Sequence, residues 1–114
     1  MLPSFTIVAI ASDAALLRSL AFALGVDGYR VEACDSWAAA RDLTSAALCV
    51  IIDADICRKD ADARRSLLDP ANRMVLLADG MSPAVDHGNA RVLTKPLAGS
   101  DILETVDLFR LSAT

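Results

Sequence analysis

The chain has 114 residues and a formal net charge of −4, so we expect residues 1–114 to form a single domain with a hydrophobic core. The acidic balance argues against binding of a phosphate backbone, which needs a concentrated basic face, and we expect no nucleic-acid partner for this domain. Hydrophobic residues make up 54% of the chain and aromatic residues only 4%, which favours small helices packed on a sheet over an aromatic-rich β-barrel.

No feature of the sequence indicates a membrane or a secreted protein. No apolar run reaches the ~20 residues that span a bilayer, and no positive charge precedes the first apolar segment, as it would in a signal peptide. Cys34, Cys49 and Cys57 stand at irregular spacing, which fits a reducing compartment better than a disulfide framework. We therefore expect a cytoplasmic protein that makes no membrane contact.

The start of the chain predicts a strand, a helix and a second strand. Residues 5–11 form an apolar run, and Ser12 and Asp13 follow it as residue types that cap helices. Apolar residues then recur at helical spacing as far as Gly28. Residues 29–34 alternate apolar and polar side chains, as a strand near a sheet edge does.

The middle of the chain predicts a helix, a buried strand and another helix. Asp35 and Ser36 can cap an alanine-rich helix over residues 37–46. Residues 48–55 form an apolar run that stops at carboxylates, and its β-branched residues indicate a strand buried on both faces. A more charged segment, residues 58–68, predicts a helix that ends shortly before a proline.

The last part of the chain predicts two more strands and a final helix. Residues 74–78 are a fourth apolar run, and residues 91–94 form a short fifth one. Glycine and proline between these two runs leave room only for a shortened helix. Ser100 and Asp101 open the final helix.

Five strands that alternate with five helical segments predict a flavodoxin-like, three-layer α/β/α sandwich. Crossovers between parallel strands are right-handed, and both faces of the sheet must be covered. The simplest strand order, 2-1-3-4-5, places the ends of the first and third strands side by side. Because ligands bind beyond the carboxyl ends of parallel strands, Asp53 is the main candidate for a functional residue, with Ser12 and Asp13 as its neighbours.

The order of these motifs resembles the receiver domain of two-component response regulators. The resemblance rests on Asp13 after the first strand, Asp53 at the end of the third, and Lys95-Pro96 after the fifth. It implies that Asp53 matches the phosphoacceptor, Lys95 matches the lysine that contacts the phosphoryl oxygens, and an acidic pair after the first strand helps to hold Mg²⁺. The cation and the lysine would neutralise the oxygens that gather around the acceptor.

Several positions depart from the receiver pattern. The acidic pair falls on Ala11 and Ser12, Ala78 replaces the hydroxyl residue that ends the fourth strand, and Val92 replaces the aromatic residue of the fifth strand. Neither alanine nor serine is a good Mg²⁺ ligand. A one-residue shift of the first helix would restore one acid by placing Ser12 and Asp13 at the pair, but it would disturb the helical register.

We therefore predict an atypical receiver domain, or pseudo-receiver, that acts in signal transduction through protein contacts and is not an enzyme. Its partner would be a kinase, an output domain or another regulator. The resemblance also implies a homodimer through the last strand, the last helix and the helix before them. Asp13, Asp53 and Asp55 are candidate metal ligands for Mg²⁺, since Asp55 stands two residues beyond Asp53 and would face the same way on one strand.

Two alternative hypotheses remain open. In the first, Asp53 is a working phosphoacceptor, served by a histidine kinase in a phosphorelay. In the second, the chain is a small-molecule or redox sensor that uses a roomier pocket near Ala11, Ser12, Ala78 and Cys57. In the redox version, the basic residues that follow Cys57 would lower the pKa of its thiol and make it reactive.

Overall fold

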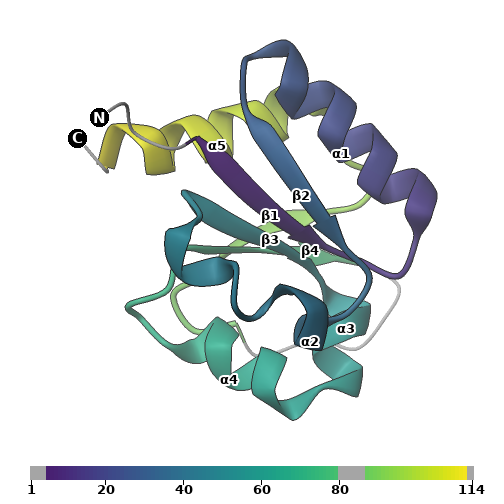
Figure 1. Cartoon of the computed structure of the whole chain (residues 1–114), viewed down its shortest axis with the longest axis vertical. Coiled ribbons are helices and arrows are strands. Elements are labelled where there is room, and N and C mark those ends of the chain that lie inside the picture. Colours follow the sequence, from purple (N-terminus) through teal and green to yellow (C-terminus); the bar gives the residue numbers. More distant parts are fainter. Residues whose placement is uncertain (1–4, 80–86, 113–114) are drawn as a thin grey trace.

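The computed structural model describes residues 5–79 and 87–112, which form a five-stranded parallel sheet with helices on both faces (Figure 1). The strand order is β2-β1-β3-β4-β5. The strands are β1 (Thr6–Ile10), β2 (Arg30–Cys34), β3 (Cys49–Asp53), β4 (Met74–Ala78) and β5 (Arg91–Thr94). The predicted flavodoxin-like sandwich and its strand order are confirmed.

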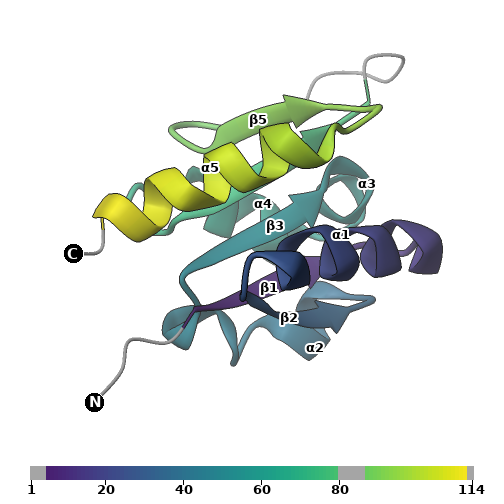
Figure 2. The same ribbon diagram turned by 90° about the horizontal axis from the view of Figure 1, so that it is seen from above.

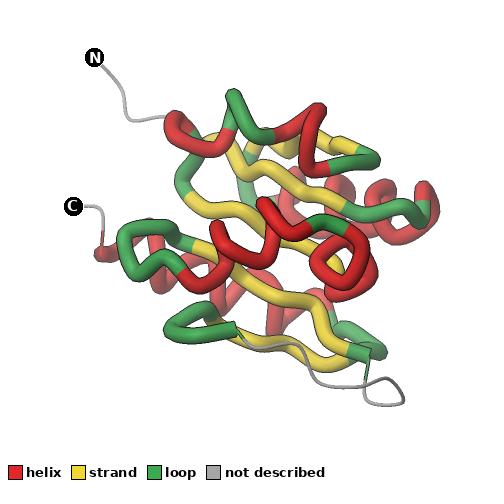
Figure 3. Tube along the Cα trace, turned by 90° about the horizontal axis from the view of Figure 1, so that it is seen from below, coloured by secondary structure: helices red, strands yellow, loops and turns green. Residues whose placement is uncertain are grey.

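Two long helices cover one face of the sheet and several shorter ones cover the other. Figure 2 shows the two long helices lying side by side, and the opposite view in Figure 3 shows the shorter helices in front of the strands. The long helices are α1 (Ala14–Val26) and α5 (Gly99–Ser112). The shorter ones are α2 (Trp37–Ala40), the 3₁₀ turn η1 (Thr44–Ala46), α3 (Ala54–Lys59) and α4 (Ala61–Leu68).

The central strands are apolar because both of their faces are covered. Alternate side chains of a strand point to opposite faces, so β1 and β3 contribute to two separate hydrophobic clusters. The side chains that point towards α2, α3 and α4 are those of Val8, Ile10, Val50 and Ile52. The side chains that point towards α1 and α5 are those of Ile7, Ala9, Cys49 and Ile51. All eight are almost fully buried, which explains why these segments read as continuous apolar runs.

The helix predicted over residues 37–46 is shorter than expected. Ser36 caps it as predicted, because its side-chain oxygen accepts a hydrogen bond from the Ala39 N–H at 3.2 Å. However, α2 ends at Ala40 and a 3₁₀ turn follows. The Thr44 hydroxyl donates to the Arg41 carbonyl at 2.9 Å, a local bond that competes with continuation of the helix.

The charged segment after β3 contains two helices rather than one. Asp60 separates them by capping α4, because its Oδ1 accepts hydrogen bonds from the N–H groups of Asp62 and Ala63 at 2.9 and 3.2 Å. The Arg64 guanidinium closes the end of α3 by donating to the Cys57 carbonyl at 2.8 Å. The chain therefore turns into a helix directly after β3.

This early helix corrects the prediction for Asp55. The strand ends at Asp53, and Asp55 lies in the first turn of α3. The prediction that both carboxylates stand on one strand and face the same way is therefore wrong. The shortened helix predicted between β4 and β5 falls mainly on residues 80–86, which lie outside the described residues; Asp79 and residues 87–90 are not helical.

A polar and aromatic cluster fixes the end of α5 to the start of β2. The Tyr29 hydroxyl donates a hydrogen bond to the Asp107 carboxylate, and Arg110 lies 3.6 Å from the same carboxylate. The Arg110 guanidinium carbon also lies 5.6 Å from the centroid of the Tyr29 ring, a cation–π contact. Burial and Asp107 together raise the pKa of Tyr29 to about 12, so its hydroxyl remains a donor at neutral pH.

None of the described helices is long and apolar enough to cross a membrane.

We predict that Leu24→Ala lowers the free energy of unfolding by about 2–5 kcal/mol, because it leaves a cavity in the core. Leu24 is fully buried, whereas Phe22 on the same helix is 77% exposed. The matched control Phe22→Ala should change stability by less than about 0.5 kcal/mol. Urea unfolding followed by circular dichroism measures both, and equal losses would contradict this assignment of the buried face of α1.

Candidate functional site

The two residues that the sequence singled out, Asp53 and Lys95, meet at the carboxyl edge of the sheet. Asp53 is the last residue of β3, and Lys95 directly follows β5. The Lys95 Nζ donates to the Asp53 Oδ1 at 2.9 Å, and the Lys95 backbone N–H donates to the Ala78 carbonyl at 2.8 Å. Because β4 lies between β3 and β5, the lysine side chain reaches across the end of β4 to its partner.

The Asp53 carboxylate is buried and receives its compensation from the lysine. Its side chain is only 7% exposed, while that of Lys95 is 32% exposed. Asp53 also occupies the N-cap position of α3, yet its side chain makes no capping hydrogen bond. The carboxylate is therefore directed at Lys95 rather than at the helix that it precedes. Removing one partner of such a pair leaves a buried charge uncompensated.

The loop after β1 supplies no acidic pair to this site. Ala11 is buried, Ser12 is exposed, and the carboxylate of Asp13 is used as the N-cap of α1. The Asp13 Oδ1 accepts hydrogen bonds from the N–H groups of Ala15 and Leu16 at 2.9 and 3.3 Å. This agrees with the register in which the acidic pair of receivers falls on Ala11 and Ser12, without the one-residue shift.

Asp55 forms a second polar contact beside the site. Its Oδ2 accepts a hydrogen bond from the Lys59 Nζ at 3.0 Å and one from the Ser12 Oγ at 3.4 Å. The contact with Lys59 is the main reason that the pKa of Asp55 is lowered. The bond with Ser12 joins the loop after β1 to α3 next to Asp53. Sequence analysis missed this connection because it placed Asp55 on a strand.

The carboxylates of the site do not form a set of donors that fits Mg²⁺, an ion that favours six oxygen ligands in near-octahedral array. Asp13 caps a helix, Asp53 is paired with Lys95, and Asp55 is paired with Lys59. Within residues 5–79 and 87–112, no group of three or more His, Cys, Asp or Glu side chains could hold a metal ion. Metal binding by Asp13, Asp53 and Asp55 stays a prediction.

Cys57 does not have the reactive character that one hypothesis assigned to it. Its side chain is fully buried. Burial, followed by the nearby charge of Asp53, raises the pKa of the Cys57 thiol to about 11. Arg64 and Arg58 lower it, but by less than burial raises it. The prediction of a thiolate with a lowered pKa is therefore wrong, because desolvation outweighs the positive neighbours.

The region expected to form a roomier pocket is packed. Ala11, Asp53 and Cys57 are each no more than 5% exposed, so a small molecule has no open path to them in this conformation. Ala78 ends β4 and offers only a methyl group. Val92 on β5 is 38% exposed and offers no aromatic ring. The structure thus brings Asp53 and Lys95 together without the other functional groups that a receiver site uses.

We predict that Lys95→Met lowers the free energy of unfolding by about 1–3 kcal/mol, because the buried Asp53 carboxylate loses its partner. Lys59→Met is the matched control, since it removes an exposed ion pair and should cost less than about 0.5 kcal/mol. Urea unfolding measures both. Equal losses in the two variants would show that the buried pair has no special weight.

The cysteines should differ in reactivity because their burial differs. Burial raises the pKa of Cys49 to about 12 and that of Cys57 to about 11, whereas Cys34 is only half-buried. Iodoacetamide at pH 8 should label Cys34 first, and the other two only after unfolding. Mass spectrometry of the Cys34→Ser variant provides the check: fast labelling of its folded form would contradict this order.

Comparisons with known proteins agree with the geometry. The chain is 39% identical over 117 residues to the transcriptional regulator protein FixT of Rhizobium meliloti (strain 1021), with 99% of each chain covered. No family model matches the chain.

Solved receiver structures share the fold. A response regulator receiver protein from Sinorhizobium medicae WSM419 has a TM-score of 0.73 at 19% identity, with 100% of both chains covered. A putative response regulator from Chloroflexus aurantiacus J-10-fl has a TM-score of 0.75 at 17% identity, with 93% of this chain and 97% of the other covered. Together with the sequence relationship to FixT, these likenesses agree with the resemblance that the motifs indicated: the chain belongs to the family of the transcriptional regulator FixT and has the fold of response-regulator receiver domains.

Proposed function

We propose that this domain is a phosphorylation-independent protein-interaction module of signal transduction and that it is not an enzyme. The observation that carries the proposal is the ion pair between Lys95 and the buried Asp53. Phosphorylation would require an Asp53 oxygen to attack phosphorus and form a new P–O bond while the leaving group departs. One of these oxygens already binds Lys95 at 2.9 Å, and only 7% of the side chain is exposed to a donor.

The residues around Asp53 support the same proposal. Ala11 and Ser12 offer no carboxylate for a metal ion, and Ala78 offers no hydroxyl for a phosphoryl oxygen. The negative charge that an aspartyl phosphate adds would be neutralised only by Lys95. Val92 has no ring that could change position and report phosphorylation to the surface. Both the chemical step and its read-out therefore lack the groups that a conventional receiver uses.

A protein is the partner that the chain fits best. The name of its relative FixT describes a transcriptional regulator, yet the net charge of −4 disfavours direct contact with DNA. We infer that any regulation passes through a kinase, an output domain or another regulator. The outer face of α1 supports such contact, because Phe22 and Val26 lie one turn apart and are 77% and 73% exposed.

The homodimer that the family resemblance implies belongs to this proposal as well. The described residues include two elements of the expected dimer surface, β5 and α5. Val92 on β5 is 38% exposed, and Leu108 on α5 is 40% exposed. Partly exposed apolar side chains of this kind are typical of protein contacts. A cytoplasmic location also remains part of the proposal.

We predict that acetyl phosphate with Mg²⁺ leaves the intact mass of the protein unchanged, because Asp53 is shielded and no acidic pair holds the ion. A conventional receiver, treated in parallel, is the positive control. A phosphoryl adduct that the Asp53→Asn variant lacks would overturn the proposal and favour the working phosphoacceptor.

In a strain that lacks this chain, Asp53→Asn should restore regulation as fully as the wild type does. Phe22→Glu should fail to restore it, because a charge would enter the exposed face of α1. Both variants must first show wild-type thermal unfolding. Loss of regulation in Asp53→Asn alone would contradict phosphorylation independence.

A further inference from the structure

A second candidate binding site lies at the amino ends of β4 and β5, at the opposite edge of the sheet from Asp53. A cavity of about 430 Å³ opens there. Its lining includes Pro70, Arg73, Met74, Asn89, Arg91 and Phe109. Arg73 immediately precedes β4 and Arg91 begins β5, so two neighbouring parallel strands place two arginines in the lining of one cavity.

The cavity is basic although the chain as a whole is acidic. Among the residues that the structure describes, no aspartate or glutamate lines it. The ion pairs found among residues 5–79 and 87–112 involve Lys59, Arg65, Lys95 and Arg110, so neither cavity arginine is neutralised by a carboxylate there. Two cations that line one cavity repel each other, and a bound anion reduces that repulsion. The charge distribution therefore favours an anionic ligand.

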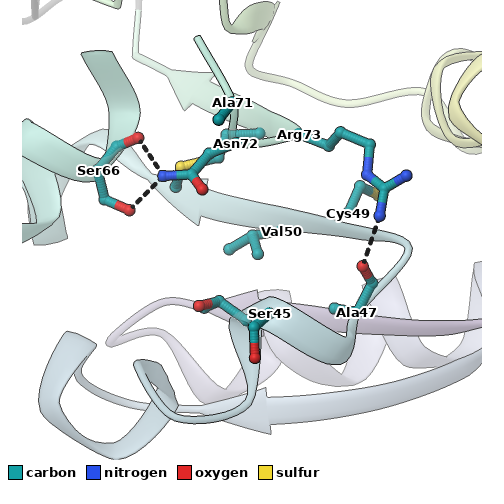
Figure 4. Close-up of a pocket in the computed structure, with 10 residues that line it drawn as sticks. Ser45, Ala47, Cys49, Val50, Ser66, Ala71, Asn72 and Arg73 are labelled. Atoms are coloured by element: carbon teal, nitrogen blue, oxygen red, sulfur yellow. Dashed lines mark hydrogen bonds between the residues drawn. The ribbon is translucent and has the colours of Figure 1, made fainter. Parts of the chain in front are cut away.

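Contacts within the protein hold parts of this wall in place. Figure 4 shows a neighbouring pocket that shares Asn72 and Arg73 with this cavity. There the Arg73 Nη2 donates to the Ala47 carbonyl at 3.4 Å, and the Asn72 side-chain nitrogen donates to the Ser66 carbonyl at 2.9 Å. The first contact uses only one of the five N–H groups of the guanidinium. Arg91 is held differently, because its guanidinium carbon lies 5.6 Å from the centroid of the Phe109 ring on α5. Both arginines retain donors for a ligand.

We propose that this cavity binds a phosphorylated small molecule of about nucleotide size. Guanidinium groups recognise phosphate oxygens through paired N–H donors, and the amide of Asn89 adds a further donor. The cavity volume, about 430 Å³, lies in the usual range for small-molecule sites and exceeds what a single inorganic phosphate fills. Pro70, Met74 and Phe109 provide apolar surface for the remainder of the molecule.

Titration of the full chain with AMP, ribose 5-phosphate, adenosine and inorganic phosphate, followed by heteronuclear NMR, tests the proposal. We expect AMP or ribose 5-phosphate to bind saturably, with shifts at residues 70–74 and 89–91. Tighter binding of AMP assigns the apolar wall to a base, and equal binding assigns the site to a sugar phosphate. Absence of saturable binding by both, or adenosine binding as well as AMP, would overturn the proposal. Inorganic phosphate binding as well as AMP would also overturn it, because the site would then take an ion only.

Substitutions separate this site from general charge effects. Arg73→Gln and Arg91→Gln should each weaken AMP binding by at least about tenfold, while Arg73→Lys should retain part of it. Arg18→Gln, at an exposed arginine of α1, and Asp53→Asn, at the far edge of the sheet, should leave it unchanged. Thermal unfolding confirms that each variant is folded. Equal weakening by Arg18→Gln would reduce the effect to net charge and refute the site.

Discussion

Compensation of the buried Asp53 carboxylate by Lys95 is the constraint on which the rest of the site depends. A charged group that leaves water must find a partner or lose its charge. The two residues are 42 positions apart in the sequence, and the order β3-β4-β5 brings them to the same edge of the sheet. The fold therefore supplies the partner that burial of Asp53 demands, and the ion pair in turn ties the end of β3 to the segment after β5.

The same constraint fits our proposal that this receiver fold acts without phosphoryl transfer. In the family pattern that the resemblance implies, a metal ion held by an acidic pair shares the neutralisation of the site with the lysine. Here the loop after β1 offers Ala11 and Ser12, and Lys95 alone binds the acceptor position. Asp55 accepts hydrogen bonds from Lys59 and Ser12, and Cys57 is fully buried. We propose that this arrangement serves packing and surface recognition rather than phosphoryl transfer.

Sequence reasoning succeeded where burial on both faces of a strand dictates composition. Apolar runs predicted the buried strands β1, β3 and β4, an alternating segment predicted β2, a short segment predicted β5, and the crossover rules then limited the strand order. The meeting of Asp53 with Lys95 followed from that order. Sequence reasoning failed where a short-range contact determined the length or number of helices. The Thr44 hydroxyl bonds to the Arg41 carbonyl, and this local bond competes with continuation of α2. Asp60 caps α4 and so divides one charged segment into two helices. Neither contact leaves a periodic pattern in the sequence.

Properties that depend on burial in three dimensions were the hardest to predict. The basic residues after Cys57 suggested a lowered thiol pKa, but the side chain is buried beside Asp53 and the pKa is raised. The cavity between Arg73 and Arg91 also had no local signal, because 17 residues separate the two in the sequence and adjacent strand starts bring them together. The sign of a pKa shift and the lining of a cavity both need the packed structure.

We propose that the Asp53 site does not bind the groups used in phosphoryl transfer. The most direct measurement is a heteronuclear NMR titration with Mg²⁺ followed by beryllofluoride, which mimics an aspartyl phosphate. We expect the chemical shifts of Asp53, Lys95 and their neighbours to stay unchanged at every concentration. Saturable shifts centred on these two residues would contradict it, because they would show that the site still accepts both the metal ion and the phosphoryl group.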